Sequence, residues 1–244
     1  MKKSVIITGA SGGIGRAAAR RFAEEGWQVV IQYLTGKTRA MELLHELRAK
    51  GRIAIAVQAD VSKKEDVCRM AALCMENFGG VGVLVNNAGI AQSRLFTDIT
   101  LEDWDRMMDV NVKSVFHTCQ AVLPDMIRRK AGKIINVSSM WGQVGAACEV
   151  HYSAAKAAVI GLTKALAKEV APSGIQVNCI APGVVQTDML AEYSEDELRD
   201  LAMETPLQRL GTPEDIANAI YFLASSQSDF ITGQVLCSNG GFVI

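Results

Sequence analysis

Short apolar runs alternate along the chain with longer stretches in which apolar residues recur every three or four positions. The short runs predict buried strands, and the longer period predicts helices. The predicted strands span 4–8, 28–33, 53–58, 81–86, 133–138, 175–180 and 234–238, and the predicted helices span 14–25, 38–50, 63–77, 101–130, 151–171 and 213–225. Continuously apolar strands that alternate with helices indicate an α/β fold: a doubly wound parallel sheet of seven strands with helices on both faces. Because no linker or repeat interrupts the pattern, residues 1–244 are predicted to form a single domain.

Two stretches are less regular than the rest. The helix predicted over 101–130 contains Pro124, so it is either one long helix or a broken one. Segment 184–212 begins after Pro182-Gly183, follows a strand and carries a short acidic helix, which makes it a candidate substrate lid. Its acidic side chains are Asp188, Glu192, Glu195, Asp196, Glu197 and Asp200.

Composition narrows the functional classes. The formal net charge of −1 gives no basic footprint for nucleic acid. No apolar run approaches the ~20 residues that cross a membrane, and the first residues lack the cleavage site of a signal peptide. The six cysteines are scattered without metal-ligand spacing, which predicts reduced thiols, a cytoplasmic protein and no metal site.

A glycine-rich turn joins the first predicted strand to the first helix, with the sequence Thr8-Gly9-Ala10-Ser11-Gly12-Gly13-Ile14-Gly15. In this position such a turn brings the backbone close to a pyrophosphate at the helix N-terminus. The residues expected to contact a dinucleotide are Gly9, Ser11, Gly12, Gly13, Ile14 and Gly15. The alternative is a tight connection that binds nothing.

The end of the second strand indicates which dinucleotide is bound. NAD sites usually place Asp or Glu there to bind the ribose hydroxyls. Segment 32–37 has no acid; Thr35 is expected at the cofactor, and Lys37 and Arg39 are close enough to attract a 2′-phosphate. NADP(H) is therefore favoured. NAD(H) stays possible, because Gly12 stands where some turns carry a basic residue and the two cations also suit a solvated helix start.

Tyr152 and Lys156 lie four residues apart on a predicted helix, so their side chains share one face. An ammonium beside the phenol would lower the tyrosine pKa below its reference value of about 10. Such a tyrosine can give a proton to a carbonyl oxygen, or take one from an alcohol, near neutral pH. Ser139, at the end of the fifth predicted strand, would hold the same oxygen.

Together these features resemble the short-chain dehydrogenase/reductase family over essentially the whole chain. The matching positions are 8–15, Asp60-Val61, Asn86-Asn87-Ala88-Gly89, Asn111, Ser138-Ser139, 152–156, Pro182-Gly183 and Thr187. The resemblance implies a Rossmann-type fold and an oxidoreductase in which Tyr152 is the general acid, Ser139 binds the substrate oxygen and Lys156 binds the nicotinamide ribose. It also implies cofactor contacts from Asp60, Val61, Asn87, Ala88, Gly89, Pro182, Gly183, Val185 and Thr187.

The same resemblance gives Asn111 a role in catalysis, holding a water molecule that continues a proton relay to solvent. An asparagine within a helix also commonly forms local hydrogen bonds, so a purely structural role stays open.

Within this family the chain is most similar to the 3-oxoacyl-acyl-carrier-protein reductases, on stretches 207–214 and 231–241. A carrier protein is acidic and needs a basic surface, for which the candidates are Arg128, Arg129, Lys130 and Lys133. The same cations also suit the C-terminus of a helix, and the acidic residues of segment 184–212 would repel such a partner.

Trp141 and Glu149 lie between the predicted catalytic residues and are expected to border the substrate pocket. An apolar wall and a negative charge suit a cationic ketone. This stretch resembles reductases of the 5-aminopentanone modification on translation elongation factor P, which is the alternative function. A Trp141 packed under a loop and a solvated Glu149 would carry no such meaning.

Three further questions stay open from the sequence. The chain is a candidate for another small ketone or alcohol oxidoreductase, or for a non-catalytic NADP-sensing protein, although the complete catalytic set favours an enzyme. The apolar tail 241–244 and the apolar surfaces of helices 101–130 and 151–171 predict self-association. The family resemblance implies a homotetramer.

Overall fold

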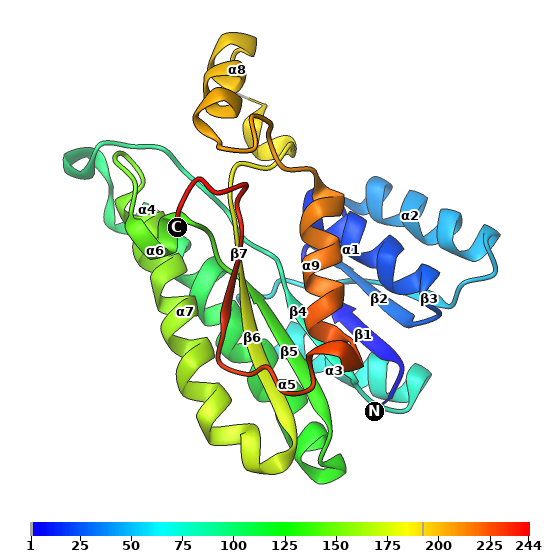
Figure 1. Cartoon of the computed structure of the whole chain (residues 1–244). Helices are drawn as coiled ribbons and strands as arrows, with labels where there is room; N and C mark the ends of the chain where they lie inside the picture. Colours follow the sequence, from blue (N-terminus) through cyan, green and yellow to red (C-terminus); the bar gives the residue numbers. More distant parts are fainter. Residues whose placement is uncertain (1, 192) are drawn as a thin grey trace.

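Seven parallel strands form one sheet in the order β3-β2-β1-β4-β5-β6-β7 (Figure 1). The structure is a computed structural model and describes residues 2–191 and 193–244. The strands are β1 Ser4–Ile7, β2 Gln28–Tyr33, β3 Ala54–Gln58, β4 Val83–Asn86, β5 Gly132–Val137, β6 Ile175–Pro182 and β7 Val235–Ser238. The predicted Rossmann-type parallel sheet of seven strands is confirmed.

Helices cover both faces of this sheet. Helices α1, α2 and α9 pack on one face, and α3, α5 and α7 pack on the other (Figure 1). The bounds are α1 Gly13–Glu24, α2 Lys37–Ala49, α3 Lys64–Phe78, α4 Leu101–Met108, α5 Ser114–Arg129, α6 Trp141–Val144, α7 Val150–Val170, α8 Glu195–Glu204 and α9 Pro213–Ala224. Within the described ranges, no helix has the length and apolar character needed to cross a bilayer.

This two-sided cover explains the apolar pattern of the strands. Successive strand residues point to opposite faces of a sheet. In β1, Ile7 packs with α1, α2 and α9, whereas Ile6 packs with α3, α5 and α7. Every position of such a strand is buried, so the sequence reads as a continuous apolar run.

The predicted helix over 101–130 is broken, but not at its proline. It consists of α4, a π-helical turn at Asp109–Lys113, and α5, and Pro124 lies inside α5. A π-turn inserts an extra residue into the helical repeat and often marks a functional position. Here it turns Asn111 inward, where the residue is only 1% exposed.

The carboxyl ends of the parallel strands meet at one edge of the sheet. Strand β1 pairs with β2 on one side and with β4 on the other. The chain builds outward from β1 to β3 on one side and from β4 to β7 on the other, so the strand order reverses between β1 and β4. Open α/β sheets bind ligands at such a switch point, beyond the carboxyl ends of the strands. The loops that carry Gly9, Asn87, Ser139 and Gly183 follow β1, β4, β5 and β6 and therefore gather at this edge.

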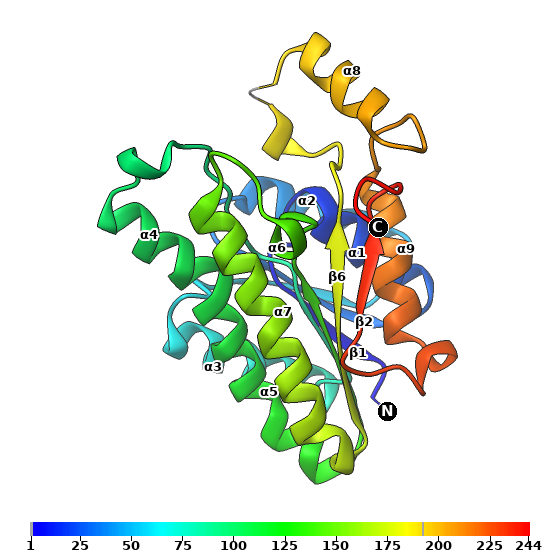
Figure 2. The same cartoon turned by 60° about the vertical axis from the view of Figure 1, so that its left-hand side comes forward.

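Segment 184–212 stands beyond the same edge, at the top of the molecule in Figure 2. It contains a short 3₁₀ turn, Asp188–Leu190, and helix α8. Ser194 caps α8: its hydroxyl accepts a hydrogen bond from Glu197 N at 3.3 Å. No residue of α8 is buried, which suits a segment that moves independently of the core. The lid function stays a prediction, and Glu192, counted among the lid acids, lies outside the described residues.

Lys133, one of the cations considered for docking a carrier protein, is buried instead. It is 3% exposed, donates to Ser225 O at 2.5 Å, and lies 2.7 Å from the Asp229 carboxylate. Ser225 follows the last residue of α9. The lysine therefore satisfies the C-terminal end of that helix and is not free to bind a partner.

The two arginines of the same group are also engaged. Arg128 and Arg129 both pair with the buried carboxylate of Asp125. The group lies where β5 begins, whereas Ser139 follows the end of β5. At ~3.3 Å per strand residue, this separates the cations from Ser139 by about 20 Å. This placement favours the alternative interpretation, in which these cations stabilise the fold.

Candidate active site

The glycine-rich turn after β1 is fastened to the loop that follows β4. Thr8 Oγ1 accepts hydrogen bonds from the backbone N–H groups of Asn87 and Ala88, each at 2.9 Å. The Asn87 side chain donates in return to Thr8 O at 2.9 Å. Gly9 has a φ of +65°, and a Cβ there would lie 2.9 Å from Ala88 Cα. The two loops approach this closely only because residue 9 lacks a side chain.

The turn also leaves the N-terminus of α1 open. The N-cap residue, Gly12, offers no side-chain acceptor to the first N–H groups of the helix. Unpaired N–H groups at a helix N-terminus suit a phosphate. The residues present therefore fit the pyrophosphate of a dinucleotide.

Gln32 has a role that the sequence did not reveal. Its Oε1 accepts a hydrogen bond from Gly9 N at 2.7 Å, and its Nε2 donates to Ala59 O at 2.6 Å. The Gln32 side chain is 2% exposed and connects the glycine-rich turn to the end of β3. The buried Gln32 amide is therefore not a counterpart of the acid that binds the ribose hydroxyls in NAD sites.

The predicted catalytic side chains come together at the carboxyl edge of the sheet. Ser139 follows β5, and Tyr152 and Lys156 lie one turn apart on α7. The Ser139 hydroxyl lies close enough to the Tyr152 phenol to lower its pKa. Lys156 Nζ donates to Val137 O at 3.1 Å and lies 5.6 Å from the centroid of the Tyr152 ring.

Neighbouring residues hold this arrangement in place. Ser138 Oγ donates to Lys156 O at 2.8 Å and so fixes α7 to the end of β5. Ser139 Oγ accepts a hydrogen bond from Trp141 N at 3.2 Å. Trp141 begins α6, a helix that the sequence did not predict because four residues are too short for a periodic pattern.

The expectation that Lys156 lowers the pKa of Tyr152 is wrong for this structure. Burial raises the pKa of Tyr152 to about 12; the hydrogen bond with Ser139 lowers it, and the negative charge of Glu149 raises it. Burial likewise lowers the pKa of Lys156 to about 8. Desolvation disfavours the charged forms of both groups. The Lys156 ammonium lies beside the Tyr152 ring and donates to a backbone carbonyl, and it is not among the causes that shift the pKa of Tyr152.

Asn111 forms local hydrogen bonds. Its Nδ2 donates to Met107 O at 3.1 Å and to Ile90 O at 3.0 Å, and its Oδ1 accepts from Ile90 N at 3.2 Å. A Cβ at Gly89 would lie 2.6 Å from Asn111 Oδ1 and 3.2 Å from Lys156 Nζ. Asn111 thus fastens the loop after β4 directly beside the lysine, and its role in a water relay stays a prediction.

A cavity of about 500 Å³ connects these parts. The predicted residues that line it are Gly9, Ser11, Gly12, Gly13, Ile14, Thr35, Asp60, Val61, Asn87, Ala88, Gly89, Ser139, Trp141, Glu149, Tyr152, Lys156, Pro182, Gly183, Val185 and Thr187. Gly15 and Asn111 are not among the lining residues. A Cβ at Gly15 would lie 2.4 Å from Gly9 O, so this glycine lets α1 pack against the turn.

The sequence missed the residues that line the cavity from segment 184–212. They are Val184, Asp188, Met189, Leu190, Tyr193 and Leu201. No local pattern indicates that such residues face a site, because their position follows from how the segment lies over the sheet edge. Arg39 also lines the cavity, whereas Lys37 is not among the lining residues.

Comparison with known proteins agrees with this geometry. A family model described as Enoyl-(Acyl carrier protein) reductase matches residues 9–243. A Staphylococcus epidermidis protein named 3-oxoacyl-acyl-carrier-protein reductase FabG is 44% identical over 241 residues, which cover 99% of each chain. This chain belongs to the short-chain dehydrogenase/reductase family. It is therefore an oxidoreductase that acts on a keto or hydroxyl group with a nicotinamide cofactor.

Relatives from more distant bacteria give the same picture for this dehydrogenase/reductase. A FabG protein of Chlamydia muridarum is 41% identical over 244 residues, which cover 99% of this chain and 97% of the relative. A 3-oxoacyl-acyl-carrier-protein reductase of Synechocystis is 41% identical over 240 residues, which cover 98% and 96%.

Replacing the buried lysine should change how stability depends on pH. In the folded protein the pKa of Lys156 is about 8, compared with 10.5 for an ordinary lysine. Between these values the unfolded state binds more protons, so the free energy of unfolding rises with pH. From about pH 7.5 to 9.5 the rise is on the order of 2 kcal/mol. Lys156→Met should lose this rise in urea unfolding measurements.

The matched control is Lys164→Met, at an exposed position of the same helix. It should keep the rise of the unmodified protein. Equal pH dependence in all three proteins would contradict the low pKa of Lys156.

Proposed function

We propose that this chain reduces a ketone with NADPH, and that its substrate is a 3-oxoacyl thioester on acyl carrier protein. The meeting of the Ser139 hydroxyl and the Tyr152 phenol at the wall of the cavity is the observation that supports the reaction. Two hydroxyls held together in a buried site suit a single carbonyl oxygen, which both can contact. The substrate class is supported by the names of relatives that are 41% and 44% identical.

Tyr152 would supply the proton. With a pKa of about 12 the phenol stays protonated at neutral pH, which suits reduction, because the carbonyl oxygen takes up a proton as it gains negative charge. When bound, the dinucleotide supplies the hydride. Ser139 would stabilise the developing charge on the oxygen. Lys156, close to Gly89, would hold the nicotinamide ribose.

The two names found among similar proteins describe different reactions. An enoyl reductase reduces a carbon–carbon double bond, and a 3-oxoacyl reductase reduces a carbonyl. A pair of hydroxyl groups, Ser139 and Tyr152, suits an oxygen atom of the substrate. Relatives that match almost the whole chain also carry the 3-oxoacyl name. Both considerations favour ketone reduction.

NADP(H) is preferred to NAD(H) on the charges around the end of β2. Arg39 lines the cavity, and segment 32–37 contains no acid that would repel a 2′-phosphate. Both ends of the Gln32 amide are hydrogen-bonded to backbone groups, so this side chain does not take the place of the ribose-binding acid of NAD sites. A cytoplasmic location is proposed as well, because all six cysteines are free thiols.

Loss of the phenol should abolish most of the activity. Tyr152→Phe should lower kcat for a 3-oxoacyl thioester with NADPH by about 10²–10⁴-fold, the usual contribution of a general acid. Binding of NADPH, followed by fluorescence, should stay within about twofold because the ring is retained. Tyr221→Phe, on α9, serves as the control and should retain full activity. A Tyr152→Phe enzyme with normal kcat would refute this role.

A second candidate substrate is a cationic ketone such as the aminopentanone group on elongation factor P. Glu149 supports it. The residue lines the cavity, and its charge affects Tyr152. Burial alone accounts for the raised pKa of Glu149, with no basic side chain among the described residues opposing it. A partly buried carboxylate without a cationic partner would attract an ammonium on the substrate.

Glu149→Gln separates the two substrates. For an aminoketone, kcat/KM should fall about fivefold or more, because the favourable charge interaction is lost. For an uncharged 3-oxoacyl thioester it should change less than about twofold. The control is Glu76→Gln, at an exposed position of α3. Equal effects of Glu149→Gln on both substrates would rule out selection by charge.

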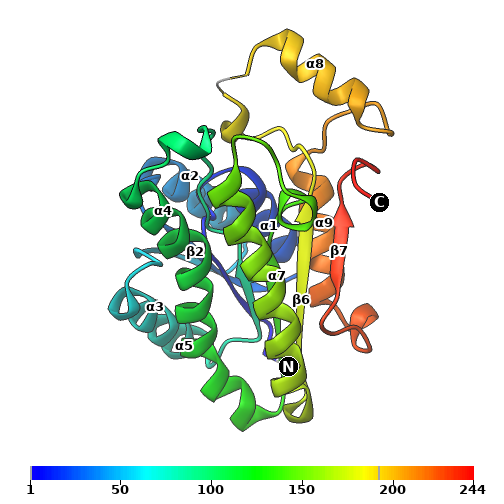
Figure 3. The same cartoon turned by 90° about the vertical axis from the view of Figure 1, so that its left-hand side faces the viewer.

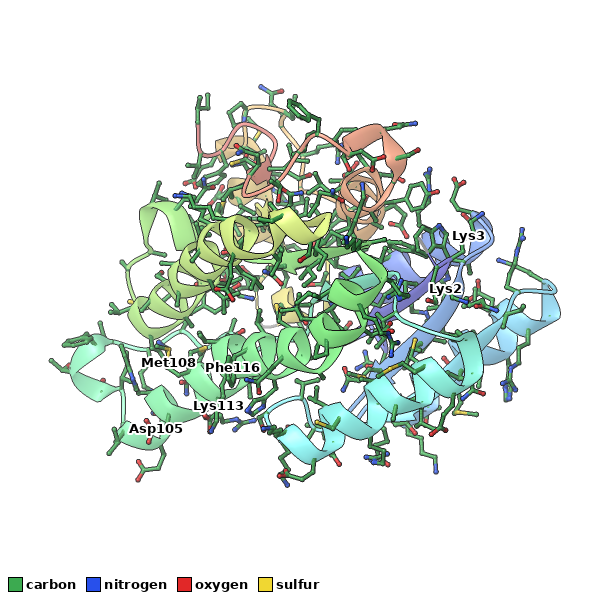
Figure 4. All side chains as sticks on the ribbon, turned by 90° about the horizontal axis from the view of Figure 1, so that it is seen from below. Lys2, Lys3, Asp105, Met108, Lys113 and Phe116 are labelled. Atoms are coloured by element: carbon green, nitrogen blue, oxygen red, sulfur yellow. The ribbon has the colours of Figure 1, made fainter. Side chains whose placement is uncertain are left out.

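We also propose a homotetramer. On one side of the molecule, Leu101 of α4 is 71% exposed and Phe116 of α5 is 50% exposed. Met108 and Phe116 lie on the outward side of this helical layer (Figure 4). At another side, β7 is an edge strand next to the C-terminus (Figure 3), and its Leu236 is 37% exposed. Two separate apolar surfaces suit a tetramer with two-fold axes.

Light scattering should give a mass near four times the 26.3 kDa of one chain. Phe116→Lys should reduce this mass, because a charge would be buried in the interface. Ile53→Lys changes an apolar residue that is slightly more exposed, at 57%, but lies beside β3, and it should leave the mass unchanged. A monomeric parent protein would contradict the proposal.

A further inference from the structure

Arg39 and Asp188 are 149 positions apart in the sequence, but their side chains meet beside Gly12 of the glycine-rich turn. Arg39 lies in the first turn of α2, directly after β2, and Asp188 begins the 3₁₀ turn of segment 184–212. The Arg39 guanidinium forms an ion pair with the Asp188 carboxylate. A Cβ at Gly12 would lie 3.4 Å from Arg39 Nη1 and 3.7 Å from Asp188 Oδ2. The ion pair therefore covers the entrance to the α1 N-terminus.

Arg39 is the basic side chain placed to read a 2′-phosphate. Among the described residues that line the cavity, the basic ones are Arg39 and Lys156. Lys156 belongs to the catalytic end, where it contacts Val137 O. Arg16, on the neighbouring helix, is directed to Glu42 and Glu46. Recognition of the 2′-phosphate would thus depend on Arg39.

The acids that line the cavity, Asp60, Glu149 and Asp188, differ in the group that each one faces. Asp60 accepts hydrogen bonds from Ser62 N at 3.0 Å and from Ser62 Oγ at 2.6 Å, so its own turn satisfies it. Glu149 lies at the catalytic end, next to Tyr152. Asp188 is the acid that already holds the guanidinium which a 2′-phosphate would need.

We propose that Asp188 competes with the cofactor 2′-phosphate for Arg39 and thereby sets how strongly this enzyme prefers NADP(H) to NAD(H). This inference rests on the proposed use of NADP(H). The Arg39 and Asp188 side chains are 51% and 75% exposed, so the ion pair is weak enough for a phosphate to replace. The cofactor 2′-phosphate, with a charge near −2, would also be repelled by the Asp188 carboxylate beside Arg39. Asp188 thus reduces the affinity for NADP(H) more than the affinity for NAD(H).

Binding measurements on four proteins test this, with NADP⁺ and NAD⁺ titrated by calorimetry. Asp188→Asn keeps the size of the side chain and removes the charge; it should tighten NADP⁺ about fivefold and change NAD⁺ less than twofold. Arg39→Gln should weaken NADP⁺ and not NAD⁺. In the double variant, Asp188→Asn should tighten NADP⁺ much less than it does alone, because most of its influence passes through Arg39.

Asp196→Asn is the matched control. It removes one negative charge from the same segment, at a residue that pairs with Arg199. Its affinity for NADP⁺ should stay within twofold of the unmodified protein. An equal gain from Asp196→Asn would mean that general charge is responsible, and would overturn the inference.

The remaining outcomes separate this inference from the cofactor assignment. If Arg39→Gln weakens NADP⁺ while Asp188→Asn changes nothing, NADP(H) stands as the cofactor and the competition is refuted. If Arg39→Gln leaves both affinities unchanged and NADP⁺ binds no tighter than NAD⁺, both the cofactor assignment and the inference fail.

Discussion

The parallel alignment of seven strands is the constraint on which the site depends. Because the carboxyl ends of all seven strands lie at the same edge, loops that are far apart in the chain meet there. Hydrogen bonds then fix their spacing. Thr8 receives the amides of the loop after β4, and Ser138 holds α7 against the end of β5. The predicted catalytic side chains are placed by these backbone contacts more than by contacts among themselves.

Burial has a larger effect on the chemistry of the site than pairing of charges. The phenol and the ammonium of the Tyr152–Lys156 pair both lose solvent, and their pKa values move toward the uncharged forms. The phenol is therefore protonated at neutral pH. Oxidation would need an additional influence that stabilises the phenolate.

Charges that look equivalent in the sequence have unlike roles. Lys133 and Arg129 support the ends of secondary-structure elements, whereas Arg39 lines the cavity. Glu149 and Asp188 both lie at the cavity, but one faces the catalytic end and the other a basic side chain. Which role each takes depends on the element that carries it and on the edge of the sheet at which that element ends.

The sequence by itself determined the seven strands and their parallel sheet, because continuous apolar strands are typical of sheets with both faces covered. It also predicted the glycine-rich turn and the grouping of Ser139, Tyr152 and Lys156, since these follow local spacing and family motifs. Only the tertiary structure decided the π-turn that buries Asn111, the direction of the Tyr152 pKa shift, and the meeting of Arg39 with Asp188. These depend on desolvation and on contacts between distant segments, and no local pattern of residues encodes either one.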